Sequence, residues 1–422
     1  MTTGTEPLMN TPSSVSSSAA AASGRQELSA VEPLRCSAVL THHWLVRRRG
    51  GEKVLEALCE LLPDSPVYTL VHDPAGAGAG WPDVHTSFLQ RIPGGRRHYA
   101  KLLPLMPLAA RRMRLPPVDL VVCSDAAIAK AMRPDPRSKV VCYCHSPMRY
   151  VWDLAETYRA SVPWLLRPFW RRTAARLRAA DRRAAERVDL FVANSRHVAD
   201  RIRRHYGRDS VVVHPPVDLP AAPATGTRED FCLCVGHHVR YKRLDLAVAA
   251  CRRLKRKLIV IGNGPDAERL CRECSGRRLV GRGGSAGRAS TLNGLRAAGR
   301  YSTTGPAVEF LGFQPDEVVR DHYRRARTLL FPGEEDFGIV PVEAMAHGCP
   351  VIAYGVGGAC ETVTDGQTGV LFDEQTVGSL AAAIERAEAI SFDPAAMHAH
   401  TQRFSRARFL REMRALLLDV LK

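Results

Sequence analysis

The stretch FPGEEDFGIVPVEAMAHGCP, residues 331–350, carries the strongest indication of how this chain folds. It begins at the end of a short apolar run, crosses an acidic loop, and enters a second apolar segment with Pro341 near its start and Gly348 at its end. Proline is favoured in the first turn of a helix and glycine just after the last turn. The stretch therefore predicts a strand, a loop and a helix, in that order.

The loop and the start of this helix predict a binding site. The N–H groups of residues 338–340 would lie free at the positive end of the helix, where they can bind a phosphate or a polyol. Glu335 in the loop and Glu343 in the first helical turn can each accept hydrogen bonds from hydroxyl groups. The same acids also fit a solvated turn and a helix-capping residue, and the stretch alone leaves both interpretations open.

Short, continuously apolar segments alternate with helical patterns along the rest of the chain. Continuous apolar character is typical of strands covered on both faces, as in a parallel sheet between helices. The strands expected in the first half are Ser37–Leu40, Leu120–Cys123, Val140–Cys144, Leu190–Ala193 and Val211–Val213. Those in the second half are Phe231–Val235, Lys257–Ile261, Val308–Leu311, Thr328–Phe331, Val351–Tyr354 and Gly369–Phe372, with helices at about 244–254, 316–326 and 377–389.

A linker rich in proline, after Pro215 and Pro216, separates these halves and predicts two doubly wound, Rossmann-like α/β domains that face a cleft. We expect a disordered tail, an N-terminal domain, a C-terminal domain and a final helix that packs back toward the N-terminal domain, at residues 1–34, 35–222, 223–400 and 401–422. Residues 275–305 hold six arginines and no acid, and predict a flexible basic insertion.

Composition limits the class of protein. The chain has 422 residues, is 45% hydrophobic and 24% charged, and carries a formal charge of +17, so it is globular and suited to polyanionic partners. Nucleic acid is disfavoured because aromatic stacking platforms and zinc-finger spacings are lacking, and a P-loop kinase because no phosphate-loop run exists. The loop Gly262-Asn-Gly-Pro lacks the third glycine of a dinucleotide-binding dehydrogenase. A single CxxC, at Cys271, leaves no metal site expected.

Further short motifs are spread over nearly the whole chain. Glu335 and Glu343 form an E-x7-E pair. In order along the sequence, the other motifs are GGEK at 50–53, YCHSPMRYVWD at 143–153, VANS at 192–195, YKRLD at 241–245, GNGP at 262–265, AYGVGGACE at 353–361 and DGQTG at 365–369. Together they resemble retaining family-4 glycosyltransferases with the GT-B fold. The 143–150 and 333–338 runs resemble most closely the bacterial O-antigen and capsule mannosyltransferases of that family.

The resemblance implies roles for individual residues. It implies catalytic roles for His145, beside the donor sugar, for Glu335, which would hold the sugar hydroxyls, and for Lys242, which would neutralise the diphosphate. It places Gly51 in a glycine-rich loop near the donor phosphates and Glu343 on the nucleotide ribose. Main-chain N–H groups that would contact the donor belong to Phe337, Gly338 and Ile339. The resemblance also implies that no metal and no cofactor are needed, because cations and helix N–H groups stabilise the leaving group.

One position departs from the family pattern. Where the family has an arginine five residues before the lysine, this chain has His237. A neutral histidine cannot replace a guanidinium group. Either His237 is protonated beside the diphosphate, or Arg240 takes over, or donor binding is weak or lost.

Two basic segments predict contact with an anionic membrane. Residues 96–114 mix six cations with apolar residues, and residues 164–187 combine eight arginines with Trp164, Phe169 and Trp170. Each segment also fits a solvated helix whose apolar side packs on its own domain. We favour membrane contact for the first segment, because a lipid-linked acceptor would bring this domain to the bilayer.

These observations lead to one functional hypothesis. We expect a retaining glycosyltransferase that moves a hexose, mannose from GDP-mannose, to a lipid-linked glycan in the synthesis of cell-surface polysaccharide. Its partners would be the nucleotide-sugar donor, the lipid-linked or glycan acceptor and an anionic membrane surface, with no nucleic acid. We expect it in the cytoplasm, peripheral at the inner face of the membrane. The alternatives are a UDP-sugar donor and, in a different class, a catalytically weak GT-B protein that binds a membrane surface.

Overall fold

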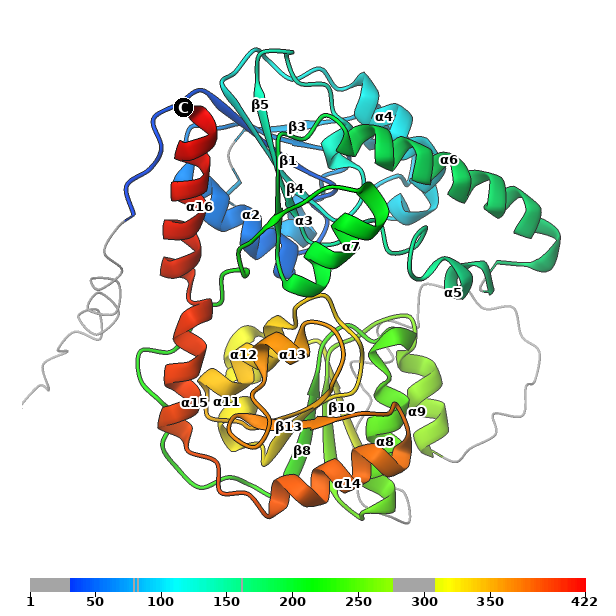
Figure 1. Cartoon of the computed structure of the whole chain (residues 1–422). Helices are drawn as coiled ribbons and strands as arrows, with labels where there is room; N and C mark the ends of the chain where they lie inside the picture. Colours follow the sequence, from blue (N-terminus) through cyan, green and yellow to red (C-terminus); the bar gives the residue numbers. More distant parts are fainter. Residues whose placement is uncertain (1–30, 79, 82, 161, 276–307) are drawn as a thin grey trace, which may run out of the picture.

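The computed structural model describes residues 31–422 except 79, 82, 161 and 276–307 (Figure 1). The N-terminal sheet is parallel, with strand order β3-β2-β1-β4-β5-β6-β7. Its strands are β1 (Ala38–His42), β2 (Val67–Thr69), β3 (Val84–Thr86), β4 (Leu120–Asp125), β5 (Lys139–Cys144), β6 (Leu190–Ala193) and β7 (Val211–Val212). All five strands expected in this half are present, and the sheet also contains β2 and β3, which we did not predict.

The C-terminal sheet is also parallel, with order β10-β9-β8-β11-β12-β13. Its strands are β8 (Phe231–Val235), β9 (Lys257–Ile261), β10 (Val308–Gly312), β11 (Thr328–Phe331), β12 (Val351–Tyr354) and β13 (Gly369–Phe372). Each lies within one residue of its predicted bounds. Two parallel sheets covered by helices confirm the expected fold class.

Helices cover both faces of each sheet (Figure 1). Those of the first half are α2 (Gly50–Leu61), α3 (Pro74–Ala77), α4 (Met106–Arg112), α5 (Ala155–Ala160), α6 (Arg167–Ala185) and α7 (Arg196–Tyr206). Those of the second half are α8 (Leu244–Arg253), α9 (Ala267–Ser275), α11 (Asp316–Arg325), α12 (Ile339–Ala346), α13 (Ala359–Thr362), α14 (Val377–Glu388), α15 (Pro394–Thr401) and α16 (Arg406–Leu421). Short 3₁₀ turns include η2 (Tyr99–Leu105), η4 (Trp164–Leu166) and η5 (Arg240–Lys242).

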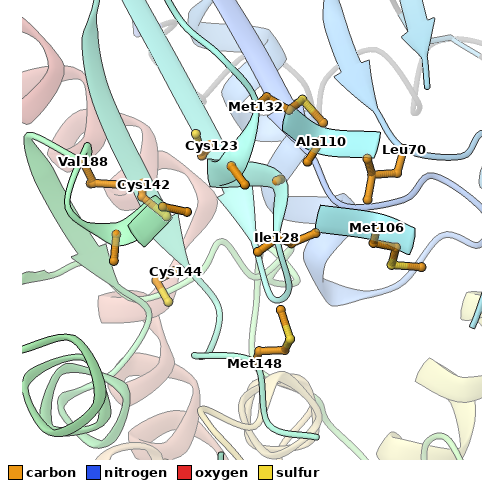
Figure 2. Close-up of a cluster of buried hydrophobic side chains, with 14 of the residues drawn as sticks. Leu70, Met106, Ala110, Cys123, Ile128, Met132, Cys142, Cys144, Met148 and Val188 are labelled. Atoms are coloured by element: carbon orange, nitrogen blue, oxygen red, sulfur yellow. The ribbon is translucent and has the colours of Figure 1, made fainter. Parts of the chain in front are cut away.

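Strand β5 shows why the central strands are mostly apolar. Cys142 and Cys144 pack into one core cluster with helix-borne residues such as Met106, while Val141 and Tyr143 pack into a second cluster on the other face of the sheet (Figure 2). Successive side chains of a strand point to opposite faces. A strand buried on both faces is therefore mostly apolar, as the sequence pattern indicated, and the buried polar residues of β4, Ser124 and Asp125, lie at its carboxyl end.

The C-terminal helices return the chain to its first half. Val217 and Ser405 form a β-bridge, and α16 then packs along α2 (Figure 1). Phe409 and Met413 lie in the core cluster of the N-terminal domain. At the other end of the chain, Leu34, which we assigned to the tail, is buried and its N–H bonds to Leu61, so packed structure begins earlier than predicted. The predicted basic insertion, residues 275–305, lies outside the described residues apart from Ser275.

Candidate active site

A cavity of about 820 Å³ lies between the two domains. Its walls come from the loop and helix start that follow β1, from the loops after β8 and β9, and from helices α11 and α12. Parallel α/β sheets bind ligands beyond the carboxyl ends of their strands, and here both sheets present that edge to the cavity. The volume is in the usual range for a small-molecule or cofactor site.

Positive charge dominates the cavity walls. The cationic side chains that line it are Arg47, Arg48, Arg49 and Lys53 from the N-terminal domain and Lys242, Arg320 and Arg324 from the C-terminal domain. The lining acids are Asp218, Asp316 and Glu343. Arg48 is bound to Glu56, whereas no described acid pairs with Arg47 or Arg49. An anionic ligand therefore finds guanidinium groups that no carboxylate neutralises.

The acidic loop of residues 333–336 is held from the opposite domain. The Arg201 guanidinium on α7 bonds to Asp336, the Ser195 hydroxyl donates to the Asp336 carbonyl at 2.5 Å, and Arg149 lies 3.5 Å from its carboxylate. His197 lies 3.4 Å from Glu334. Arg201 is 3% exposed, so this contact is a buried bridge between domains. The interpretation of the loop as a solvated turn is therefore wrong.

Lys242 and Glu335 form an ion pair of 2.7 Å at the edge of the cavity. Their contact depends on a close approach of two backbones, because a Cβ atom on Gly333 would lie 2.5 Å from the Cα atom of Lys242. Lys242 lines the cavity, whereas Glu335 stands behind it. The structure thus brings together the predicted diphosphate cation and the predicted sugar-binding carboxylate.

Glu343 lines the same cavity, in the second turn of α12 rather than the first. Its Oε1 is 2.9 Å from the Lys53 ammonium of the facing domain, and its Oε2 accepts from the Tyr323 hydroxyl at 3.3 Å. A carboxylate that joins the two domains cannot be a helix-capping residue, and the capping interpretation is wrong.

The start of α12 reaches the cavity, and of the predicted residues Ile339 and Val340 belong to its lining, whereas Phe337 and Gly338 do not. The Phe337 side chain is buried and stacks on His214. Ile339 touches the other domain at Gly50, where a Cβ atom would lie 2.8 Å from its Cδ1.

His145 lies just beyond β5, and its backbone is fixed on both sides. Its N–H donates to Asp125 and its carbonyl accepts from the Asn194 side chain. Burial, with the nearby His42, lowers its pKa to about 4, so the ring carries one proton at neutral pH. Gly51 stands beside the ring, with its Cβ position 3.7 Å from Nε2. Gly51 itself belongs to the first turn of α2, a correction to the predicted loop position.

The structure shows the surroundings of His237 and Arg240, while the alternatives for their roles beside a diphosphate stay predictions. His237 lines the cavity, and its Nδ1–H donates to the Asn263 carbonyl at 2.7 Å. Burial, followed by the charge of Arg49, lowers the pKa of His237 to about 4, which favours the neutral ring at pH 7 in the protein alone. Arg240 is exposed and does not line the cavity. The guanidinium that faces His237 is Arg49, from the other domain.

Sequence reasoning missed the residues that cross between domains. The run of three arginines at 47–49 was visible next to the glycines of α2, but nothing in it predicted contact with a distant histidine. Arg149, Ser195 and Arg201 lay in or near quoted motifs, and their partner Asp336 is more than a hundred residues away. Among the described residues no cluster of three or more His, Cys, Asp or Glu side chains is arranged for a metal, and metal independence stays a prediction.

Two doubly wound domains with a basic cavity between their strand ends have the architecture of GT-B glycosyltransferases. Residues 48–220 match the family model described as Glycosyltransferase Family 4, and residues 229–389 match the model described as Glycosyl transferases group 1. The two models take one domain each and together span most of the sequence. The chain belongs to the group 1 glycosyltransferases of the family-4 type.

Several curated proteins that are similar to this chain are described as D-inositol 3-phosphate glycosyltransferases. The chain is 33% identical over 218 residues to a D-inositol 3-phosphate glycosyltransferase of Nocardiopsis dassonvillei, a match that covers 50% of each protein. It is 29% identical over 232 residues to the enzyme of that name from Mycolicibacterium vanbaalenii, covering 51% of this chain and 49% of the relative. The matched part thus spans about half the length of these relatives.

Solved structures agree on the fold. Anabaena HepE in complex with UDP-glucose superposes with a TM-score of 0.60 at 17% identity, covering 91% of this chain and all of that one. Sucrose-phosphate synthase from Thermosynechococcus elongatus gives 0.61 at 18% identity, covering 91% and 99%. At these identities the likeness concerns architecture alone.

Proposed function

We propose that this protein is a retaining glycosyltransferase that moves a hexose from a nucleoside diphosphate to a glycan acceptor. The observation that carries the proposal is that Lys242 and the start of α12 line a basic interdomain cavity, with Glu335 paired to Lys242 behind that wall. A site of this kind offers cations and N–H groups to a diphosphate and a carboxylate to sugar hydroxyls. That combination is what transfer from a nucleotide sugar requires.

The charges suit the chemistry of the leaving group. Cleavage of a glycosyl–phosphate bond leaves new negative charge on the nucleoside diphosphate, and preorganised cations that face this charge lower the barrier. Lys242 and Arg49 approach the cavity from opposite domains, so both would contact the diphosphate once it lies between them. The lining cations support the proposal that the leaving group is stabilised without a metal.

The donor that we propose is GDP-mannose. Its support is the resemblance of the 143–150 and 333–338 runs to mannosyltransferases. A UDP-sugar is the second candidate, and its support is the solved structures of HepE with UDP and with UDP-glucose. No described residue of the cavity distinguishes the two bases.

The acceptor that we propose is a lipid-linked glycan in cell-surface polysaccharide synthesis, reached at the inner face of a membrane. Its support is the tip formed by η4 and the start of α6, which projects from the N-terminal domain (Figure 1). There Trp164, Leu165, Leu166 and Phe169 are 72%, 70%, 55% and 63% exposed. Exposed aromatics flanked by arginines suit an anionic bilayer surface.

Because of this tip, we now favour the second basic segment, residues 164–187, over the first segment, residues 96–114, as the one that contacts the membrane. In the first segment, Met106, Ala109 and Ala110 of α4 are buried in the domain core, and its exposed large apolar side chains are Leu105 and Leu108, at 42% and 46%. The second segment exposes its aromatic end instead. No described helix is both long enough and apolar enough to cross a bilayer.

A different acceptor has its own support. Curated relatives are described as acting on D-inositol 3-phosphate, and Arg320 and Arg324 would attract a phosphorylated cyclitol to the cavity. This candidate keeps the fold and chemistry and dispenses with the membrane. A weak enzyme that serves as a membrane-binding component is the third candidate, because a neutral His237 replaces the usual arginine.

Transfer of radiolabelled sugar tests the proposal. GDP-mannose, UDP-glucose and UDP-galactose are each incubated with the protein and either extracted membrane lipids or inositol 3-phosphate. We expect label in the lipid fraction with GDP-mannose, and loss of that transfer in Glu335→Ala and in His145→Ala variants that keep the wild-type melting temperature. Wild-type turnover in either variant removes that residue from the mechanism. Absence of transfer with every pair contradicts the enzymatic proposal.

A further inference from the structure

A row of four side chains lies behind the cavity in the N-terminal domain, and three of them have no part in the function proposed so far. Glu52 Oε1 lies 3.7 Å from Nε2 of His42, and Nδ1 of His42 lies 3.1 Å from the hydroxyl of Ser124. The same hydroxyl lies 2.8 Å from Nε2 of His145. Glu52 is 5% exposed, and His42 and Ser124 are completely buried.

The fold determines the positions of these four side chains. His42 and Ser124 are paired residues at the carboxyl ends of neighbouring strands β1 and β4. His145 follows β5, the next strand of the sheet, and Glu52 lies in the first turn of α2. The row therefore reaches the predicted active-site histidine through rigid elements rather than through a loop.

A serine hydroxyl holds one proton, so its two hydrogen bonds have opposite directions. A carboxylate beside Nε2 of His42 favours the ring proton at that nitrogen and leaves Nδ1 as an acceptor. Ser124 then donates to His42 and must accept from Nε2–H of His145. The single proton of the His145 ring is thereby placed on Nε2, and Nδ1 keeps its lone pair.

We propose that Glu52, His42 and Ser124 are positioning residues that hold His145 as its Nε2–H tautomer, so that Nδ1 accepts a hydrogen bond from a hydroxyl of the bound hexose. The hexose rests on the proposed function, whereas the tautomer does not. The His145 ring is half-buried, and no described residue bonds to its Nδ1. That nitrogen is therefore the one left for a ligand.

The substitution Glu52→Gln is expected to reverse the direction of every hydrogen bond in the row while the side chain keeps its volume. The second oxygen of Glu52 accepts the N–H of Arg49 at 2.9 Å, where the helix begins. In Glu52→Gln the amide oxygen keeps that bond and the NH₂ group turns to Nε2 of His42. His42 then carries its proton on Nδ1 and donates to Ser124, which donates to His145. The proton of His145 moves to Nδ1, and the nitrogen that faces the ligand changes from acceptor to donor.

Nitrogen NMR of the full-length protein, labelled with ¹⁵N at histidine, reads the tautomer directly and needs no substrate. The His145 signals are assigned by their loss in His145→Gln. We expect the proton on Nε2 in the wild-type protein and on Nδ1 in Glu52→Gln. Glu60→Gln, which removes a carboxylate from the same helix where it pairs with Arg406, is the matched control and keeps the wild-type tautomer.

Two further comparisons separate positioning from plain structural support. In a Ser124→Ala background, Glu52→Gln no longer changes the His145 signals, because the hydroxyl that links His42 to His145 by hydrogen bonds is absent. Where transfer is measurable, Glu52→Gln lowers kcat by about tenfold, the effect of one lost hydrogen bond, with a smaller change in KM. A wild-type proton on Nδ1, an unchanged tautomer in Glu52→Gln, or a reversed tautomer with unchanged kcat overturns the inference. Absence of transfer with every donor counts against the proposed function only, since the spectra decide the tautomer independently.

Discussion

Arg49 and His237 show how single residues from opposite domains complete one site. His237 occupies the place where the family pattern has an arginine, and burial keeps it neutral. Arg49 lowers the pKa of this histidine from the other side of the cavity and has no described acidic partner. A guanidinium is therefore present at the cavity, although it comes from a different element of the fold. We propose that Arg49 supplies the positive charge that position 237 lacks.

Replacement of Arg49 by alanine is expected to weaken binding of a nucleoside diphosphate by about tenfold, because one charge-assisted hydrogen bond to the phosphate is lost. Calorimetric titration measures the dissociation constant. Arg137→Ala, which removes the same charge from an exposed arginine bound to Asp135, is the control for the general electrostatic field of the protein. Equal affinities of Arg49→Ala and the wild-type protein would rule out this role.

The sequence predicted which segments form strands better than it predicted which faces of the helices are exposed to solvent. Continuous apolar runs such as Leu190–Ala193 are dictated by burial on both faces, and strand β6 has those bounds. Strands β2 and β3 have three residues each, too few for a recognisable pattern. Which side of a basic helix faces solvent depends on what packs against it, and for α4 and α6 only the structure could show that.

The tip around η4 is expected to insert into an anionic bilayer, and its aromatic side chains should supply most of the affinity. A Trp164→Ser, Phe169→Ser double variant exposes less apolar surface and should bind vesicles of phosphatidylcholine with phosphatidylglycerol about tenfold more weakly. Co-sedimentation with vesicles measures this. Leu418→Ser, at an exposed apolar residue of α16, is the control. Unchanged sedimentation of the double variant contradicts membrane insertion at this tip.

The acidic loop of residues 333–336 is the element that connects the two domains at the cavity. Arg201→Met leaves Asp336 without its buried guanidinium partner. We expect a melting temperature lower by a few degrees, because the substitution removes the buried guanidinium that joins Asp336 to Asp153 and leaves Asp336 with the longer Arg149 contact alone. Transfer should fall with it, since Glu335 is the neighbour of Asp336. An unchanged melting temperature would show that the interdomain contact contributes little in solution.

At the scale of the whole molecule, the domains are joined by buried polar contacts and by α16, which packs on α2. Sequence patterns describe local periodicity, whereas each of these interdomain contacts joins residues that are far apart in the sequence. Lys53 and Glu343 are 290 residues apart, and Arg201 and Asp336 are 135 apart. The candidate residues could be predicted from motifs, but their partners depend on the closure of one domain on the other.

Stability should fall as the pH is lowered from 7 toward 4. Burial holds the pKa of His145, His237 and His238 at about 4, below the ordinary 6.5 of the unfolded chain. Between these values the unfolded state binds protons that the native state does not, so acid favours unfolding, by at most about 1.4 kcal/mol per pH unit for each histidine. Below pH 4 this contribution levels off. Thermal melting at pH 7, 6 and 5 measures the effect, and a constant melting temperature over that range would contradict it.

The most direct test of the central claim is calorimetric titration of the protein with GDP and with UDP in the presence of EDTA. We expect that one of the two binds without metal, and that Lys242→Ala weakens this binding about 10- to 100-fold through loss of the ammonium. Preference for GDP supports the mannose donor, and preference for UDP keeps the enzyme class and replaces that donor. Binding of neither nucleotide would contradict the claim that this basic interdomain cavity is a nucleotide-sugar site.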